Sequence, residues 1–246
     1  MTMKSTLAGS VGAATLALLA SAGAVSAADS FEWSVNAAGT SDYVFRGISQ
    51  SDEDPAFQAG FDASYGMFYV GTWGSTVDSA FVGGSSAEID FYAGIKPTWG
   101  PATFDFGVLY YWYPGSSSAG PGDPDVIELK AGVSGELFKN LSAGAVLYWS
   151  DEGAYNSGEY FVYEGTLAYA LPKVMIFEPS ISGTVGHVDN QDFDADYTYW
   201  NAGLSLVVEK FTFDFRYWDT DTTVIGPTGK DLADERFAFT AKIALP

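Results

Sequence analysis

The alternation of apolar and polar residues between Phe31 and Gly47 constrains the fold of this chain most strongly. In this segment, FEWSVNAAGTSDYVFRG, apolar side chains fall mainly on odd positions up to Phe45, and polar side chains fall mainly on even positions from Glu32 to Arg46. A period of two over about 15 residues exceeds the usual strand of a soluble sheet, which has about 5–6 residues. A tilted strand that crosses a bilayer needs about 9–11 residues, with apolar side chains toward lipid. The segment therefore predicts a membrane strand, and a long strand of a soluble sandwich is the alternative.

The first 28 residues have the pattern of an export signal. Lys4 supplies a positive charge, residues 7–20 are apolar, and the segment ends in the small residues Ser26, Ala27 and Ala28. The apolar run is too short and too rich in Ala and Gly for a transmembrane helix. We therefore predict a signal peptide at residues 1–28, removed on export, and one outer-membrane β-barrel domain at residues 29–246.

Further segments repeat this alternation, so the sequence predicts about twelve strands. The twelve segments span residues 31–46, 57–65, 68–75, 88–96, 103–112, 127–136, 141–149, 160–171, 177–185, 200–208, 211–217 and 236–245. The short connections lie around residues 66, 97–101, 138–141, 171–174 and 209–210, and the long ones around residues 47–56, 76–87, 113–125, 150–159, 186–197 and 219–234. Outer-membrane barrels have short turns on one side of the membrane and long loops on the other. The fold class predicted is therefore all-β, an antiparallel up-and-down transmembrane β-barrel.

Acidic residues outnumber basic ones in the chain and are concentrated in the long connections. The formal net charge is −20, and the long connections hold 17 of the 31 acidic residues but only one base, Lys230. Such a charge opposes binding to nucleic acid or to an anionic membrane surface. Cysteine is absent, so disulfides and thiolate chemistry are both excluded.

Four motifs along the chain resemble one family of proteobacterial proteins. They are TSDYVFRGISQSDEDPAFQAGFD at residues 40–62, FYVGTWGS at 68–75, EIDFYAG at 88–94 and YYWYPG at 110–115. With these motifs the chain resembles the TorF-type porins, and the resemblance spans most of residues 29–246. It implies an outer-membrane barrel with a porin-like role.

Candidate catalytic and metal-binding residues are few. His187 is the only histidine, and its parity places it on the apolar face near a loop. A barrel lipid hydrolase would carry a serine two positions later, where Asp189 stands, so we favour an interfacial histidine. Asp192, Asp194 and Asp196 alternate as carboxylates do in calcium loops, but the glycine and glutamate of an EF-hand are absent. We therefore favour a solvated acidic loop over weak divalent binding.

The polar faces of the predicted strands would line the lumen of the barrel with charged side chains. The predicted pore-lining residues are Glu32, Asp42, Arg46, Asp62, Glu88, Asp90, Lys96, Asp105, Glu128, Lys130, Glu136, Glu164, Glu178, Asp214, Arg216, Arg236 and Lys242. The alternative is a ladder of paired charges that plugs a closed barrel, as side chains fill the interior of eight-stranded barrels. Twelve strands lie between that limit and the open porins, so both a narrow passage and a plug are physically allowed.

We therefore predict a porin-like channel in the outer membrane of a Gram-negative cell, for passive passage of small solutes or ions, with a weak preference for cations. We predict that it is not an enzyme and needs no cofactor. Its predicted partners are outer-membrane lipid, lipopolysaccharide and small solutes or cations. Two alternatives are kept. One is a non-conducting structural or surface-interaction barrel that uses its acidic outer loops, and the more remote one is a membrane-face lipid hydrolase based on His187.

Overall fold

The computed structural model describes residues 30–116 and 124–246 of the 246-residue chain, and the predicted signal peptide at residues 1–28 lies outside these ranges. The described residues are mostly β-structure, with one short 3-10 helix at Ala154–Asn156. Within these ranges, no helix has the length and apolarity that a bilayer crossing by a helix requires. The strands are β1 Phe31–Thr40, β2 Val44–Phe45, β3 Ile48–Ser49, β4 Ala56–Tyr65, β5 Phe68–Thr76, β6 Ala87–Ile95, β7 Thr98–Trp99, β8 Ala102–Trp112, β9 Val126–Phe138, β10 Leu141–Ser150, β11 Tyr160–Ala170, β12 Glu178–Asn190, β13 Tyr197–Val208, β14 Phe211–Thr220 and β15 Arg236–Leu245.

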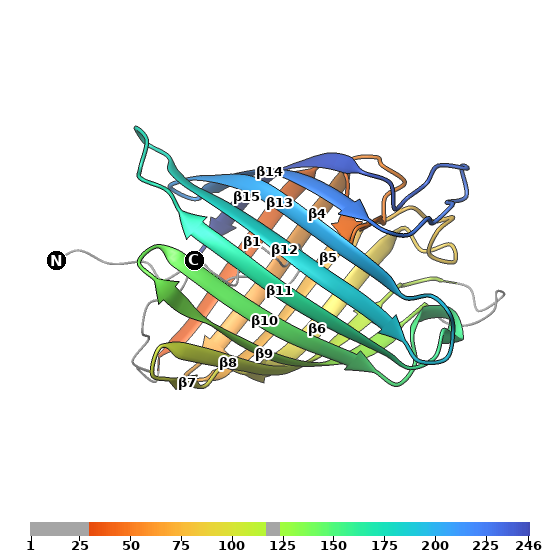
Figure 1. Ribbon diagram of the computed structural model, residues 1–246, viewed down its shortest axis with the longest axis horizontal. Helices are drawn as coiled ribbons and strands as arrows, with labels where there is room; N and C mark the ends of the chain where they lie inside the picture. Colours follow the sequence, from red (N-terminus) through yellow and green to blue (C-terminus); the bar gives the residue numbers. More distant parts are fainter. Residues whose placement is uncertain (1–29, 117–123) are drawn as a thin grey trace.

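Twelve of these strands close into one antiparallel barrel (Figure 1). Successive long strands pair with each other, and the ring closes where β1 pairs with β15, from Val35 opposite Leu245 to Thr40 opposite Thr240. β7 only extends the turn before β8, and β2 and β3 form a separate hairpin. The predicted all-β, twelve-strand, up-and-down barrel is therefore confirmed.

The two faces of the strands follow the predicted parity around most of the barrel. On β9, Leu129 points outward and is 49% exposed, whereas its neighbours Glu128 and Lys130 are buried inside. On β8, Phe106 is 47% exposed and the adjacent Asp105 is buried. The outer surface therefore carries apolar side chains, as a surface in contact with lipid requires.

This difference between the faces leads to a first prediction. A lysine in place of Leu129 should lower the free energy of unfolding by about 2–4 kcal/mol near the bilayer midplane, whereas a lysine in place of the inward-facing Thr212 should cost much less. Urea unfolding of protein refolded in lipid vesicles measures both costs, and Phe106→Lys and Phe213→Lys repeat the outward test. Equal costs for the outward and inward positions would show that the two faces are assigned wrongly.

The two ends of the barrel carry connections of different length. One end, here called the short-turn end, has the connections 66–67, 96–101, 139–140, 171–177 and 209–210. The other end, here called the long-loop end, has the connections 41–55, 77–86, 113–125, 151–159, 191–196 and 221–235. The predicted contrast in length fails at 191–196, which is shorter than 171–177 and no longer than 96–101. β12 and β13 keep pairing as far as Val188 opposite Tyr197, so little chain remains to form a loop there.

The first strand is shorter than the sequence predicts. β1 ends at Thr40, and residues 41–55 leave the wall and turn into the barrel, so the predicted continuous strand at residues 31–46 is wrong. At the tip of the hairpin of β2 and β3, Arg46 and Gly47 have φ angles of 48° and 84°. This left-handed conformation ends an extended strand. Tyr43, which alternation places on the lipid side, is therefore buried inside the barrel.

Candidate functional site

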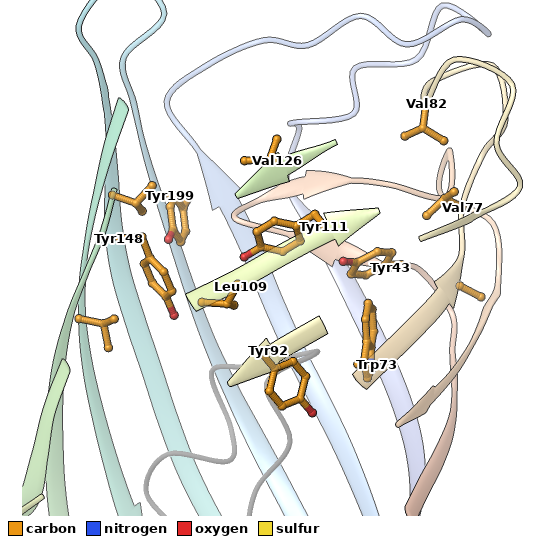
Figure 2. Packing of buried hydrophobic residues seen from close by; sticks show 13 residues of the cluster. Tyr43, Trp73, Val77, Val82, Tyr92, Leu109, Tyr111, Val126, Tyr148 and Tyr199 are labelled. Carbon is orange, nitrogen blue, oxygen red and sulfur yellow. The ribbon is translucent and has the colours of Figure 1, made fainter. Parts of the chain in front are cut away.

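Residues 41–55, here called the inserted loop, fill the interior of the barrel near its long-loop end. Tyr43, Arg46, Ser49 and Asp52 of this loop are all buried. Figure 2 shows Tyr43 beside Trp73 of β5, with the rings of other strands in the same part of the interior. The centroids of the Tyr43 and Trp73 rings lie 5.3 Å apart in an edge-to-face arrangement. The loop is thus packed against the wall as a core element would be.

The loop between β14 and β15 holds the inserted loop from the long-loop end. The amide of Ser49 donates to the carbonyl of Leu232 (2.8 Å), and Lys230 lies 3.5 Å from a carboxylate oxygen of Asp52. Arg236 at the start of β15 binds Asp42 at 3.1 Å. These three contacts join two connections that lie far apart in the sequence, so they are expected to move together.

Arg46 at the hairpin tip forms an ion pair with Glu128 of β9. Its Nη1 and Nη2 atoms donate to Oε1 and Oε2 of Glu128 at 2.6 and 2.9 Å. The inserted loop leaves the wall between β1 and β4, and β9 lies five strands away from β1 around the twelve-strand ring. The pair therefore spans the interior, and the bidentate geometry makes it one of the stronger kinds of charged hydrogen bond.

The wall around this pair presents aromatic rings and hydroxyl groups to the guanidinium and the carboxylate. Tyr111 of β8 and Tyr160 of β11 donate to Glu128 at 2.8 and 2.7 Å. The guanidinium carbon of Arg46 lies 4.7 Å from the ring centroid of Phe45 and 4.8 Å from that of Tyr148. Glu128 is 0% exposed, so the carboxylate depends on these partners in place of water.

A pattern of tyrosine hydroxyls donating to carboxylates continues around the interior. The further pairs are Tyr43 with Glu88 (2.9 Å), Tyr113 with Glu88 (3.0 Å), Tyr69 with Asp105 (2.8 Å), Tyr92 with Asp62 (2.6 Å), and Tyr199 with Glu164. A phenol satisfies an oxygen of the carboxylate without cancelling its charge. Burial, and the neighbouring carboxylates of Glu88 and Asp90, raise the pKa of Tyr43 well above its usual value, so this phenol stays a donor.

Close glycines let two of these rings lie flat against the wall. The ring of Tyr92 covers Gly71 on the neighbouring strand β5, and the ring of Tyr199 covers Gly186 on β12. A Cβ atom at either glycine would collide with the ring. The glycines therefore set the position of each hydroxyl relative to its carboxylate.

Further ion pairs lie deeper in the barrel, away from the inserted loop. Lys130 of β9 binds Asp105 of β8 at 2.6 Å, and Lys96 lies 3.9 Å from the same oxygen. On β14, Arg216 binds Asp214 at 3.0 Å. Arg216 is held in addition by Asn201 and by Ser182, the latter at 3.0 Å.

The structure separates the sequence-predicted charged residues into three groups. Those near the inserted loop are Asp42, Arg46, Glu88, Asp90, Glu128, Glu164 and Arg236. Those deeper inside are Asp62, Lys96, Asp105, Lys130, Asp214, Arg216 and Lys242. Those in the third group, Glu32, Glu136 and Glu178, are exposed near the short-turn end. Asp42 and Arg46 reach the interior from the inserted loop and not, as predicted, from a strand of the wall.

Three carboxylates near the inserted loop form no ion pair in the described part of the chain. Within residues 30–116 and 124–246, Glu88, Asp90 and Glu164 take part in no ion pair. Asp90 is buried, and its Oδ1 atom has no hydrogen-bond partner. Acidic side chains therefore outnumber basic ones inside the barrel, close to the inserted loop.

Sequence reasoning missed the aromatic residues of the interior. Tyr92 shares the parity of Glu88 and Asp90 on β6, and Tyr111 shares that of Asp105 on β8. The shared parity with carboxylates is the signal that could have identified them as inward-facing. Hydrophobic character alone assigns such rings to the lipid side, because a tyrosine is apolar over most of its surface.

The other candidate residues lie at hairpin ends. His187 is on β12, where its Nδ1 atom lies 3.1 Å from Oγ1 of Thr198. Asp192 accepts a hydrogen bond from the amide of Glu159 and Asp196 from the amide of Asn190, while Asp194 is exposed between them. Among the residues that the structure describes, no group of three or more acidic or histidine side chains lies close enough together to hold a metal ion.

Comparison with solved structures shows that the barrel is similar in fold to two porins. The KdgM porin in complex with disordered oligogalacturonate has a TM-score of 0.57 at 7% identity, over 87% of this chain and 98% of KdgM. The NanC porin has a TM-score of 0.53 at 13% identity, over 87% of this chain and 100% of NanC. At identities this low the likeness concerns the fold, since one fold hosts many functions.

Comparison with protein families identifies the group to which the sequence belongs. None of the curated proteins matches the chain. One family profile matches residues 24–244, almost the whole sequence. This match does not test the narrower assignment to the TorF-type porins, which stays a prediction. The chain belongs to the family described as "Bacterial protein of unknown function (Gcw_chp)".

Proposed function

We propose that this protein is a narrow outer-membrane channel for small solutes or ions, with a weak preference for cations. The main support is the surplus of acidic over basic side chains near the inserted loop, where Glu88, Asp90 and Glu164 form no ion pair with any described residue. Carboxylates along a passage raise the local concentration of cations. The apolar outer face would contact outer-membrane lipid, and the loops at the opposite end from the short turns would meet lipopolysaccharide.

The cation preference is proposed to be weak because most interior charges are paired. Glu32, Glu136 and Glu178 are exposed near the short-turn end, which leaves eight acidic and six basic residues of the predicted set further inside. Acidic side chains on the long-loop connections would add a negative entrance. The fold likeness to porins agrees with a channel but carries no information on its selectivity.

The inserted loop is proposed to keep the passage narrow. Arg46 reaches across the interior to Glu128, and the side chains around the pair exclude water from that carboxylate. A passage at this level can open widely only if the hairpin moves. The same observation favours a second candidate function, a non-conducting barrel that presents its acidic loops to a surface partner.

Planar-bilayer recordings of refolded protein decide between the two candidates. We expect small single-channel currents and a reversal potential that shows cation preference at low salt. The preference should fade near 1 M salt, because the screening length falls to about 3 Å. Correct folding is checked by the difference in gel mobility between unheated and boiled protein. Folded protein without current would support the non-conducting barrel, and anion preference would contradict the proposed function.

A further inference from the structure

The surroundings of Arg46 have the composition of a binding site for a guanidinium group. Such a group is planar, carries its charge over several N–H donors, and is best held by a bidentate carboxylate and by aromatic faces. Glu128 supplies the bidentate carboxylate, at 2.6 and 2.9 Å. The ring of Tyr148 supplies a face at 4.8 Å.

The wall part of this site is built without help from the inserted loop. Tyr111, Glu128, Tyr148 and Tyr160 come from the four consecutive strands β8 to β11. The hydroxyls of Tyr111 and Tyr160 donate to opposite oxygens of Glu128, Oε2 and Oε1, and fix the plane of the carboxylate. The site is therefore preorganised on strands, which hold a geometry better than loops do.

The group that fills this site comes from a strained segment. Arg46 has a φ angle of 48° at the tip of a hairpin, in a region that residues other than glycine seldom adopt. If the hairpin leaves, Glu128 loses its cation and keeps only the hydroxyls of Tyr111 and Tyr160 as partners, which is unfavourable. A free guanidinium that takes the place of Arg46 would restore the contacts with Glu128 and Tyr148, so the exchange is less costly than simple departure of the loop.

We infer that Glu128, with Tyr111, Tyr148 and Tyr160, binds the guanidinium group of a small solute, and that Arg46 occupies this site as a tethered guanidinium until the solute displaces it. The inference rests on the proposed channel function and names its substrate class, guanidinium-bearing solutes. Displacement would release the inserted loop and widen the passage. A tethered group competes at an effective concentration on the order of millimolar, so the solute is expected to act in or above that range.

The absence of cysteine from the sequence permits a direct test of displacement in the native background. Gln50, buried in the inserted loop, is replaced by cysteine, and the rate of its labelling by a water-soluble maleimide reports departure of the loop. Ser142, buried on β10 outside the loop, is replaced by cysteine as the matched control. The probe is ethylguanidinium chloride at concentrations up to tens of millimolar, well below the molar range in which guanidinium salts unfold proteins.

Ethylguanidinium should raise the labelling rate of Gln50→Cys in a saturable manner, by at least about fivefold if the tether competes as expected. Equal concentrations of sodium chloride or ethylammonium chloride should have little effect, and Ser142→Cys should not respond. Adding Glu128→Gln should abolish the dependence on ethylguanidinium. A labelling rate that ethylguanidinium leaves unchanged, or changes no more than sodium chloride does, would overturn the inference.

Calorimetric titration of Arg46→Ala tests the site with the tether removed. This variant should bind ethylguanidinium at least about tenfold more tightly than the wild type, since no tethered group competes. The Arg46→Ala/Glu128→Gln variant should not bind it. If ethylguanidinium binds Arg46→Ala but does not displace Arg46 in the wild type, the pair of Arg46 and Glu128 only holds the inserted loop in place. That result would also overturn the inference. Neither assay needs current through the barrel, so a failure of the channel proposal is recognised separately by the bilayer recordings.

Discussion

Replacing Arg46 with alanine should raise the single-channel conductance several-fold and strengthen the preference for cations. Arg46 is the part of the inserted loop that reaches the far wall, where it binds Glu128 at 2.6 Å. Its removal takes away both the bulk that crosses the interior and one positive charge. The charge of Glu128 is then no longer compensated, and a larger negative charge along a passage favours cations.

Arg216→Ala is the matched control for the effect of charge. This arginine pairs with Asp214 on its own strand, so its loss removes the same charge without freeing the inserted loop. It should therefore shift the reversal potential toward cations while the conductance rises much less than in Arg46→Ala. Planar-bilayer recordings in a salt gradient give both quantities. A shift of Arg46→Ala toward anions, or a conductance equal to that of the wild type, would contradict the role given to the inserted loop.

Replacing Glu128 with alanine should lower the free energy of unfolding by about 3–5 kcal/mol, because it leaves a buried charge without its partner. Arg46 is 9% exposed and would keep the stacking rings of Phe45 and Tyr148 but lose its carboxylate. The hydroxyls of Tyr111 and Tyr160 would lose their acceptor in the same substitution. Urea unfolding of refolded protein, followed by tyrosine and tryptophan fluorescence, measures this cost.

The controls for this experiment are the double variant Arg46→Ala/Glu128→Ala and a variant of an exposed ion pair. The double variant should cost clearly less than the sum of the two single variants, since neither charge is then left alone. Glu178→Ala removes the partner of Lys173, a pair exposed near the short-turn end, and should cost less than about 1 kcal/mol. Additive costs at Arg46 and Glu128, or a cost at Glu128 as small as at Glu178, would show that the pair does not hold the inserted loop.

Local pattern was enough to predict the wall of the barrel. On β14, Phe211, Phe213 and Phe215 alternate with Asp214 and Arg216, and the structure places the two sets on opposite faces. Successive side chains of a strand must point to opposite faces, so a period of two can be read from neighbouring residues alone. Strand number and the antiparallel order followed from counting such segments and the turns between them.

The interior of the barrel was decided by contacts between residues distant in sequence. Arg46 and Glu128 are 82 positions apart and meet only because β9 lies nearly opposite β1 in the closed ring. The parity of Tyr43 and Phe45 continues that of β1, yet the chain turns inward after Thr40. Alternation cannot reveal such a turn, because its cause is the burial of Arg46 and Tyr43 against partners on other strands.

The sequence by itself determined most of the strands, most of their outward faces and the surplus of acid in this protein. Those properties depend on residues one or two positions apart, so they can be predicted from the composition and from the period of apolar residues. Only the tertiary structure decided that residues 41–55 enter the barrel, that tyrosines donate to the interior carboxylates, and that Glu88, Asp90 and Glu164 stay without a base. These outcomes depend on which strands face each other once the ring closes, and that arrangement comes from the register of all twelve strands together.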